Sequence, residues 1–68
     1  MAELLNRVRD AREAKGWTQA RLAERIGVSR KTVNTVENGV FIPSTVVALK
    51  LARALDEPVE RLFSLTAG

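Results

Sequence analysis

Residues 27–39, GVSRKTVNTVENG, combine cationic and amide side chains with three valines in a pattern typical of a short amphipathic helix. On a helical wheel that advances about 100° per residue, Val33 and Val36 fall together on one side. The opposite face, which spans roughly 140° of the wheel, carries cationic, amide and hydroxyl groups: Arg30, Lys31, Asn34, Thr35 and Asn38. The two valines therefore attach the helix to a core, and the polar residues point outward.

The composition of this polar face suits recognition of nucleic acid. Guanidinium, ammonium and carboxamide groups match the donor and acceptor pattern of base edges in the major groove, and no carboxylate lies in the middle of the face. Arg30 and Lys31 also lie at the helix N-terminus, where a phosphate would offset their repulsion with the helix dipole and use the free N–H groups. An ordinary solvated helix face is the alternative interpretation of the same residues.

Two helices joined by a tight turn are expected to position this face. The first should begin with Thr18 as its N-cap and end before Gly27. The second should begin with Ser29 as its N-cap and end at Gly39. Glycine at position 27 permits the positive φ that a tight turn between crossing helices needs. The sequence therefore predicts a helix-turn-helix over about residues 18–38.

Helical periodicity continues on both sides of this unit, and strict alternation is absent. A first helix is expected over about residues 2–15, a fourth from near Ser44, and a short fifth with Pro58 in its first turn. The expected buried residues are Leu4, Leu5, Val8 and Ala11 in the first helix, Val47, Ala48, Leu51 and Leu55 in the fourth, and Val59, Leu62 and Phe63 in the fifth. The last five residues should fray. Residues 1–68 are thus predicted to form one all-α domain of five short helices.

Composition excludes several classes of function. The 68 residues contain no cysteine and no histidine, which rules out disulfides, a Cys/His zinc site and a thiol nucleophile. No nucleophile–base set, glycine-rich phosphate loop or metal-ligand spacing occurs, so we expect neither an enzyme nor a cofactor nor a bound metal. The formal charge of +3 is only mild support for a nucleic-acid partner, since its distribution matters more than its total.

Nothing in the sequence indicates a membrane or a secretory route. No apolar run approaches the roughly 18 residues that a membrane span requires, and no signal peptide is evident. We therefore expect a cytoplasmic protein with no membrane partner and no small-molecule ligand.

The whole pattern resembles the phage-repressor type of helix-turn-helix DNA-binding domain, the Cro/cI-like or XRE family. The resemblance covers about residues 7–63 and is carried by RVRDAREAKGWTQARLAERIGVSRKTVNTVENG, PSTVVALKLARAL and PVERLF, in that order. It implies a compact five-helix domain that binds double-stranded operator DNA as a homodimer, with the helix over residues 29–38 in the major groove. A repressor that acts on a near-palindromic operator is the implied function. An antitoxin or a protein-interaction adaptor with the same fold is the alternative.

The resemblance also assigns roles to individual residues by position. Arg30, Lys31 and Thr35 match base-facing positions, and Asn34 lies between them, within reach of a base. The expected phosphate contacts are Gln19, Asn38 and, at the helix N-terminus, Ser29. Arg12 and Glu37 match a partly buried ion pair that ties the first helix to the third.

Two regions depart from the family pattern. Apolar residues occupy positions that are often polar, and an exposed apolar run usually marks an interface. We expect a dimer contact there, made by Phe41, Ile42 and Val46 together with Leu62 of the fifth helix. Packing under the loop between the third and fourth helices is the alternative for Phe41 and Ile42. Asp56 stands where the family often has glycine, so the following turn should differ.

Overall fold

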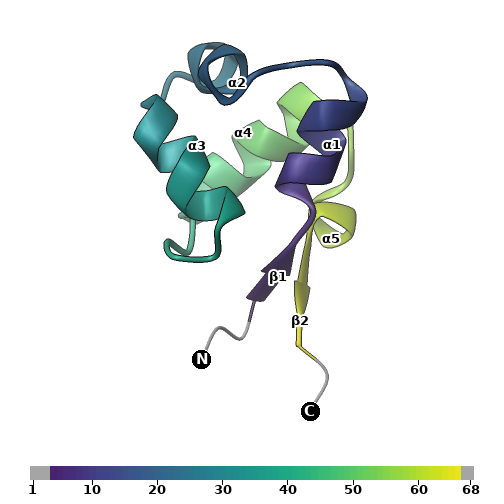
Figure 1. Cartoon of the computed structure of the whole chain (residues 1–68). Coiled ribbons are helices and arrows are strands. Elements are labelled where there is room, and N and C mark those ends of the chain that lie inside the picture. The colour runs from purple at the N-terminus through teal and green to yellow at the C-terminus, as the bar shows by residue number, and fades with distance from the viewer. Residues whose placement is uncertain (1–3, 67–68) are drawn as a thin grey trace.

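The computed structural model describes residues 4–66, which form five helices and two short strands (Figure 1). In chain order the elements are β1 (Leu4–Asn6), α1 (Val8–Ala14), α2 (Gln19–Ile26), α3 (Arg30–Glu37), α4 (Thr45–Leu55), α5 (Val59–Leu62) and β2 (Phe63–Leu65). The chain is therefore mostly helical, as expected, but the strands pair into a small sheet that an all-α prediction does not contain. Within the described part, no helix has both the length and the apolar character needed to cross a membrane.

The first helix begins later than expected, because Leu4–Asn6 form strand β1 instead of a helical turn. This strand pairs antiparallel with β2, and the pairing satisfies backbone groups that a helix would otherwise bond internally. Leu4 and Leu5 consequently point to opposite faces of the sheet: Leu4 is half-buried, whereas Leu5 is 55% exposed. Ala2, near the expected helix start, lies outside the described residues.

Asn6 marks the boundary between β1 and α1. Its Oδ1 accepts a hydrogen bond from the backbone N–H of Val8 at 3.2 Å, and its Nδ2 donates to the carbonyl of Val36 at 3.0 Å. Asparagine favours such positions because its side chain competes with the helix for local backbone groups. This one side chain therefore bonds the first residue of α1 and also ties strand β1 to Val36 in the last turn of α3.

The C-terminal segment is more ordered than the sequence suggested. Phe63 begins β2 and is not part of α5, and Pro58 is the N-cap of that helix rather than a residue of its first turn. The prediction of fraying is wrong for Ser64 and Leu65, which pair with β1. Residues 67–68 lie outside the described part of the chain.

Local side-chain chemistry fixes the ends of α2 and α3, as the sequence predicts. Thr18 and Ser29 each accept a hydrogen bond from the backbone N–H three residues later, at 3.0 and 3.1 Å. Gly27 ends α2 in the left-handed conformation with φ 74°, and Gly39 follows α3 with φ 73°. The predicted helix-turn-helix is therefore present with the expected caps.

The core that supports this unit draws apolar side chains from all five helices and from β2: Val8, Leu22, Ala23, Ile26, Val33, Val36, Leu51, Ala52, Leu55, Leu62 and Phe63. Val33 and Val36 are each 2% exposed and anchor α3, as the wheel indicated. Leu62 is 1% exposed, so its assignment to a dimer surface is wrong. A helix as short as α5 depends on its apolar side chains to hold it against the domain, and Leu62 serves that purpose.

Asp56 ends α4 with φ 57° and ψ 44°, and it is the one non-glycine residue with positive φ among the described residues. A left-handed conformation costs a residue with a Cβ about 1–2 kcal/mol, which explains why glycine suits this position.

We expect Asp56→Gly to raise the free energy of unfolding by up to about 1 kcal/mol, because glycine's entropy cost of about 0.5–1 kcal/mol offsets only part of the relieved strain. Urea unfolding followed by circular dichroism measures the change. Glu57→Gly, one residue later and without positive φ, should lower the midpoint. A lower midpoint for Asp56→Gly as well would contradict the strain argument.

Candidate nucleic-acid interface

Helix α3 lies at the left edge of the molecule in Figure 1, beside α2, with one face in the core and the other in solvent. Arg30, Lys31, Asn34 and Asn38 are all exposed, and they follow one another along the outer face of the helix. The structure therefore gathers two cations and two amides on a single accessible surface.

An open hollow of about 350 Å³ lies on this surface between the start of α2 and the first turns of α3. Its lining consists of Gln19, Arg30, Lys31 and Asn34. Two of these side chains are cationic and the other two are carboxamides, so the hollow offers donors to an anionic or acceptor-rich group.

The three carboxamides of this surface are joined by hydrogen bonds. Gln19 Nε2 donates to Glu37 Oε1 at 3.1 Å, Asn34 Nδ2 donates to Gln19 Oε1 at 3.4 Å, and Asn38 Nδ2 donates to Asn34 Oδ1 at 3.3 Å. These bonds connect the first residue of α2 with successive turns of α3. The sequence assigned Gln19 and Asn38 to phosphate contact and Asn34 to base contact. In the structure, hydrogen bonds connect all three side chains.

The two hydroxyl groups of the predicted site are occupied locally. Ser29 Oγ caps α3 through the backbone N–H of Thr32 and lies 2.9 Å from the Thr32 hydroxyl. Thr35 Oγ1 lies within hydrogen-bond distance of the carbonyls of Lys31 and Thr32, at 3.0 and 3.1 Å, and Thr35 is half-buried. Since a hydroxyl has only one proton to donate and these carbonyls accept it, the Thr35 hydroxyl can offer another group only its acceptor lone pairs.

Arg12 and Glu37 form a buried ion pair between α1 and α3. Arg12 Nε lies 2.7 Å from Glu37 Oε2, and the two side chains are 11% and 0% exposed. The same guanidinium donates through Nη2 to Glu37 Oε1 at 3.2 Å and through Nη1 to the carbonyl of Trp17 at 2.7 Å. The pair therefore ties α3 to α1 inside the domain.

The surroundings keep Glu37 ionised. Burial by itself would raise the pKa of this carboxyl, but hydrogen bonds from Arg12 and Gln19, the charge of Arg12 and a hydrogen bond from Arg9 together lower the pKa below its ordinary value. The hydrogen bond to Glu37 raises the pKa of Arg12 in turn, against the effect of burial. The negative charge is thus retained, and the guanidinium of Arg12 balances it inside the domain.

Arg9 belongs to this site and was not assigned a role from the sequence. Its Nη2 donates to Asn38 Oδ1 at 2.7 Å, and its Nε donates to Glu37 Oε1 at 3.3 Å. The available signal is its position three residues before Arg12, which places both guanidinium groups on the same side of α1. Arg9 is 49% exposed in its side chain, so it lies at the edge of the surface.

Apolar side chains are exposed at a different place. Phe41, Ile42 and Val46 are 48%, 68% and 60% exposed. Phe41 and Ile42, in the loop between α3 and α4, also line a small crevice beside β1 and β2. Part of each side chain therefore packs against the domain, and part remains exposed. In Figure 1 this loop and β1 lie at the same end of the molecule. We call Phe41, Ile42 and Val46 the apolar patch.

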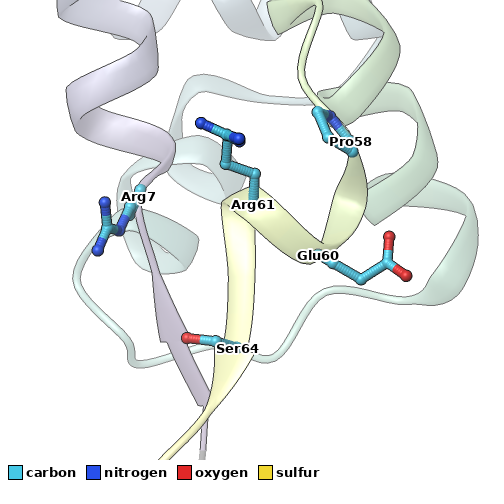
Figure 2. A pocket seen from close by; sticks show the side chains of 5 residues that line it. All are labelled: Arg7, Pro58, Glu60, Arg61 and Ser64. Carbon is cyan, nitrogen blue, oxygen red and sulfur yellow. The ribbon is translucent and has the colours of Figure 1, made fainter.

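A further pocket of about 520 Å³ lies near the start of α1 and α5. Figure 2 shows the five side chains that line it: Arg7, Pro58, Glu60, Arg61 and Ser64. Arg7 and Glu60 point in opposite directions in this view, and the labelled polar groups do not converge on a common point. The pocket therefore lacks the convergent polar groups of a binding site.

Comparison with known proteins agrees with this geometry. The family model described as helix-turn-helix matches residues 8–62. The uncharacterized HTH-type transcriptional regulator YgzD of Bacillus subtilis is 38% identical over 60 residues, which cover 88% of this chain and 91% of YgzD. An uncharacterized HTH-type transcriptional regulator of Methanothermobacter thermautotrophicus is 44% identical over 59 residues, 85% of this chain and 86% of that protein.

A solved structure extends the similarity to three dimensions. The restriction-modification controller protein C.AhdI from Aeromonas hydrophila superposes with a TM-score of 0.75 at 42% sequence identity. The match covers 79% of this chain and 82% of C.AhdI.

Proposed function

The chain belongs to the XRE family of Cro/cI-like helix-turn-helix transcriptional regulators, a family of DNA-binding proteins and not of enzymes, and we propose that it represses transcription as a homodimer on a near-palindromic operator. In this arrangement α3 lies in the major groove. The two copies of α3 in a symmetric dimer would enter successive major grooves about 34 Å apart.

The observation that carries the proposal is the exposed cationic and amide face of α3. Arg30 or Lys31 would read guanine, since Arg and Lys donate to its O6 and N7. Asn34 would pair with adenine through one N–H and one lone pair of its carboxamide. Thr35 would present its methyl group and lone pair to a neighbouring base.

Contacts to phosphate would fix the register of the domain on the duplex. Gln19 and Asn38 flank the base-reading residues and each has carboxamide N–H groups, while Ser29 lies at the N-terminus of α3. Helix N-termini attract phosphate because their N–H groups are free and the helix dipole is positive there.

Binding to duplex DNA tests the proposal directly. Fluorescence anisotropy with a labelled mixed-sequence duplex should show saturable binding at about 50 mM salt, with log K falling linearly as log salt rises. The slope should be about −0.9 for each phosphate that is neutralised. No binding to any duplex at low salt, by a folded protein, would overturn the proposal and favour an antitoxin or adaptor that recognises protein alone.

The apolar patch supports the homodimer part of the proposal. Phe41→Asp should shift the protein toward monomer in sedimentation velocity, because a charge in a buried interface is costly. Ala20→Asp, an apolar-to-acid change on the exposed side of α2, is the matched control and should leave the profile unchanged. A stable dimer of folded Phe41→Asp protein would place the interface elsewhere.

A further inference from the structure

We propose that Arg9 is a positioning residue for DNA recognition: through hydrogen bonds it fixes the orientation of the Asn38 and Asn34 carboxamides before DNA binds. This inference rests on the proposed function and adds to it a residue outside the helix-turn-helix itself. Gln19, Asn34 and Asn38, joined by their side-chain hydrogen bonds, are called the amide series below.

The amide series is bonded to a cation at one end and to a carboxylate at the other. At one end, Arg9 Nη2 donates to Asn38 Oδ1 at 2.7 Å. At the other, Gln19 Nε2 donates to Glu37 Oε1 at 3.1 Å. Arg9 also donates to the same Glu37 oxygen at 3.3 Å, so the bonds close into a ring that spans α1, α2 and α3.

Arg9 and Glu37 fix which group donates and which accepts in every hydrogen bond of the amide series. A guanidinium has only donors, and an ionised carboxylate has only acceptors. Asn38 must therefore turn its oxygen toward Arg9 and its NH2 group toward Asn34, and Asn34 must turn its NH2 group toward Gln19. Without these ends, a carboxamide could flip and exchange its donor and acceptor sides.

The fixed direction matters for the partner. Each carboxamide has two N–H donors and two acceptor lone pairs. Within the amide series Asn34 uses one of each, which leaves one N–H and one lone pair for a base edge. Asn38 likewise retains one N–H, and phosphate oxygens only accept. A preset orientation removes part of the ordering cost of binding and rejects bases that would require the flipped amide.

The experiment uses Arg9→Met, which keeps the length of the aliphatic stem and removes every donor. In ¹⁵N-labelled protein without DNA, the side-chain NH2 resonances of Asn38 and Asn34 should shift and broaden in this variant. Arg9→Lys, which retains the charge but not the two-pronged donor, should not restore them. Arg7→Met, which removes the same charge two residues earlier, is the matched control and should leave them in place.

The second measurement compares duplexes that differ at single base pairs. Arg9→Met should weaken discrimination at the position read by Asn34 by about tenfold, a part of what a good base contact contributes. A uniform loss on all duplexes with unchanged base preference and a smaller salt slope would make Arg9 a simple phosphate contact and overturn the proposal.

The two measurements separate the inference from the proposed function. Unmoved NH2 resonances in folded Arg9→Met protein would overturn the inference even if wild-type protein binds DNA. Wild-type protein that binds no duplex would refute the proposed function, and with it the recognition role of Arg9, whereas the resonances of free protein would still show whether Arg9 orients the amides.

Discussion

Glu37→Ala should lower the free energy of unfolding by about 3–5 kcal/mol, because it leaves the buried guanidinium of Arg12 without its partner. A domain of this size has a total stability of roughly 3–10 kcal/mol, so the variant should lose a large share of its stability. Urea unfolding monitored by circular dichroism measures the loss. Glu24→Ala, an acid 79% exposed on α2, is the matched control and should change stability by less than about 0.5 kcal/mol.

A double-mutant cycle that combines Glu37→Ala with Arg12→Met measures the interaction free energy between the two side chains. Glu37→Gln replaces Glu37→Ala in the cycle if the alanine variant does not fold. The two single substitutions should be strongly non-additive, since the second one removes a charge that the first left unpaired. Additive effects in folded variants would show that the pair does not stabilise the domain.

The same pair should make stability depend on acid pH. The pKa of Glu37 in the folded protein is below its ordinary value of 4.5, so the unfolded state takes up a proton first. The contribution of the ionised carboxylate is therefore complete above about pH 4.5 and is lost as pH falls through the lower, folded-state pKa. In the Glu37→Gln variant, the free energy of unfolding should therefore depend less on pH in the acid range.

Arg30→Ala and Lys31→Ala should each weaken binding to the recognised DNA sequence by about 1–3 kcal/mol and relax base preference. Both residues are exposed and occupy the first two positions of α3. Their positive charge opposes the helix dipole at a cost of about 0.3–1 kcal/mol each, so the variants should be at least as stable as the wild-type protein. Loss of binding with gain of stability is the pattern expected of residues retained for recognition. Fluorescence anisotropy and urea unfolding measure the two quantities.

Charge-matched controls separate recognition from general attraction. Arg53→Ala and Lys50→Ala remove the same charges from the exposed side of α4. Their effect on DNA affinity should be small and should disappear at higher salt. Equal losses in all four variants would mean that α3 contributes only net charge.

The helix-turn-helix could be predicted from the sequence because its determinants are local. Thr18 and Ser29 cap the helices they precede, Gly27 takes the left-handed conformation, and the two valines of α3 are buried. Each of these features depends on residues within a few positions of one another, and sequence spacing reports such features well.

The features that were missed depend on contacts between distant residues. The sheet depends on the pairing of Leu4 with Leu65, near the other end of the chain. The local spacing of Leu4, Leu5 and Val8 fits a helix, so it does not reveal this pairing. Leu62 fits an interface or a core equally well until α5 is placed. Arg9 shares a face with Arg12, but its bond to Asn38 depends on how α1 and α3 pack. A helical wheel describes one helix and does not show how that helix packs against another.

Selection of bound duplexes from a random library, run in parallel with wild-type protein and the Lys31→Ala variant, tests the central claim that the outer face of α3 reads DNA sequence. We predict that wild-type protein enriches a short motif with two related half-sites. The variant should enrich a motif with weakened preference at one position in each half-site. An identical motif for both proteins, or no enrichment by folded wild-type protein, would contradict the assignment of α3 as the recognition helix.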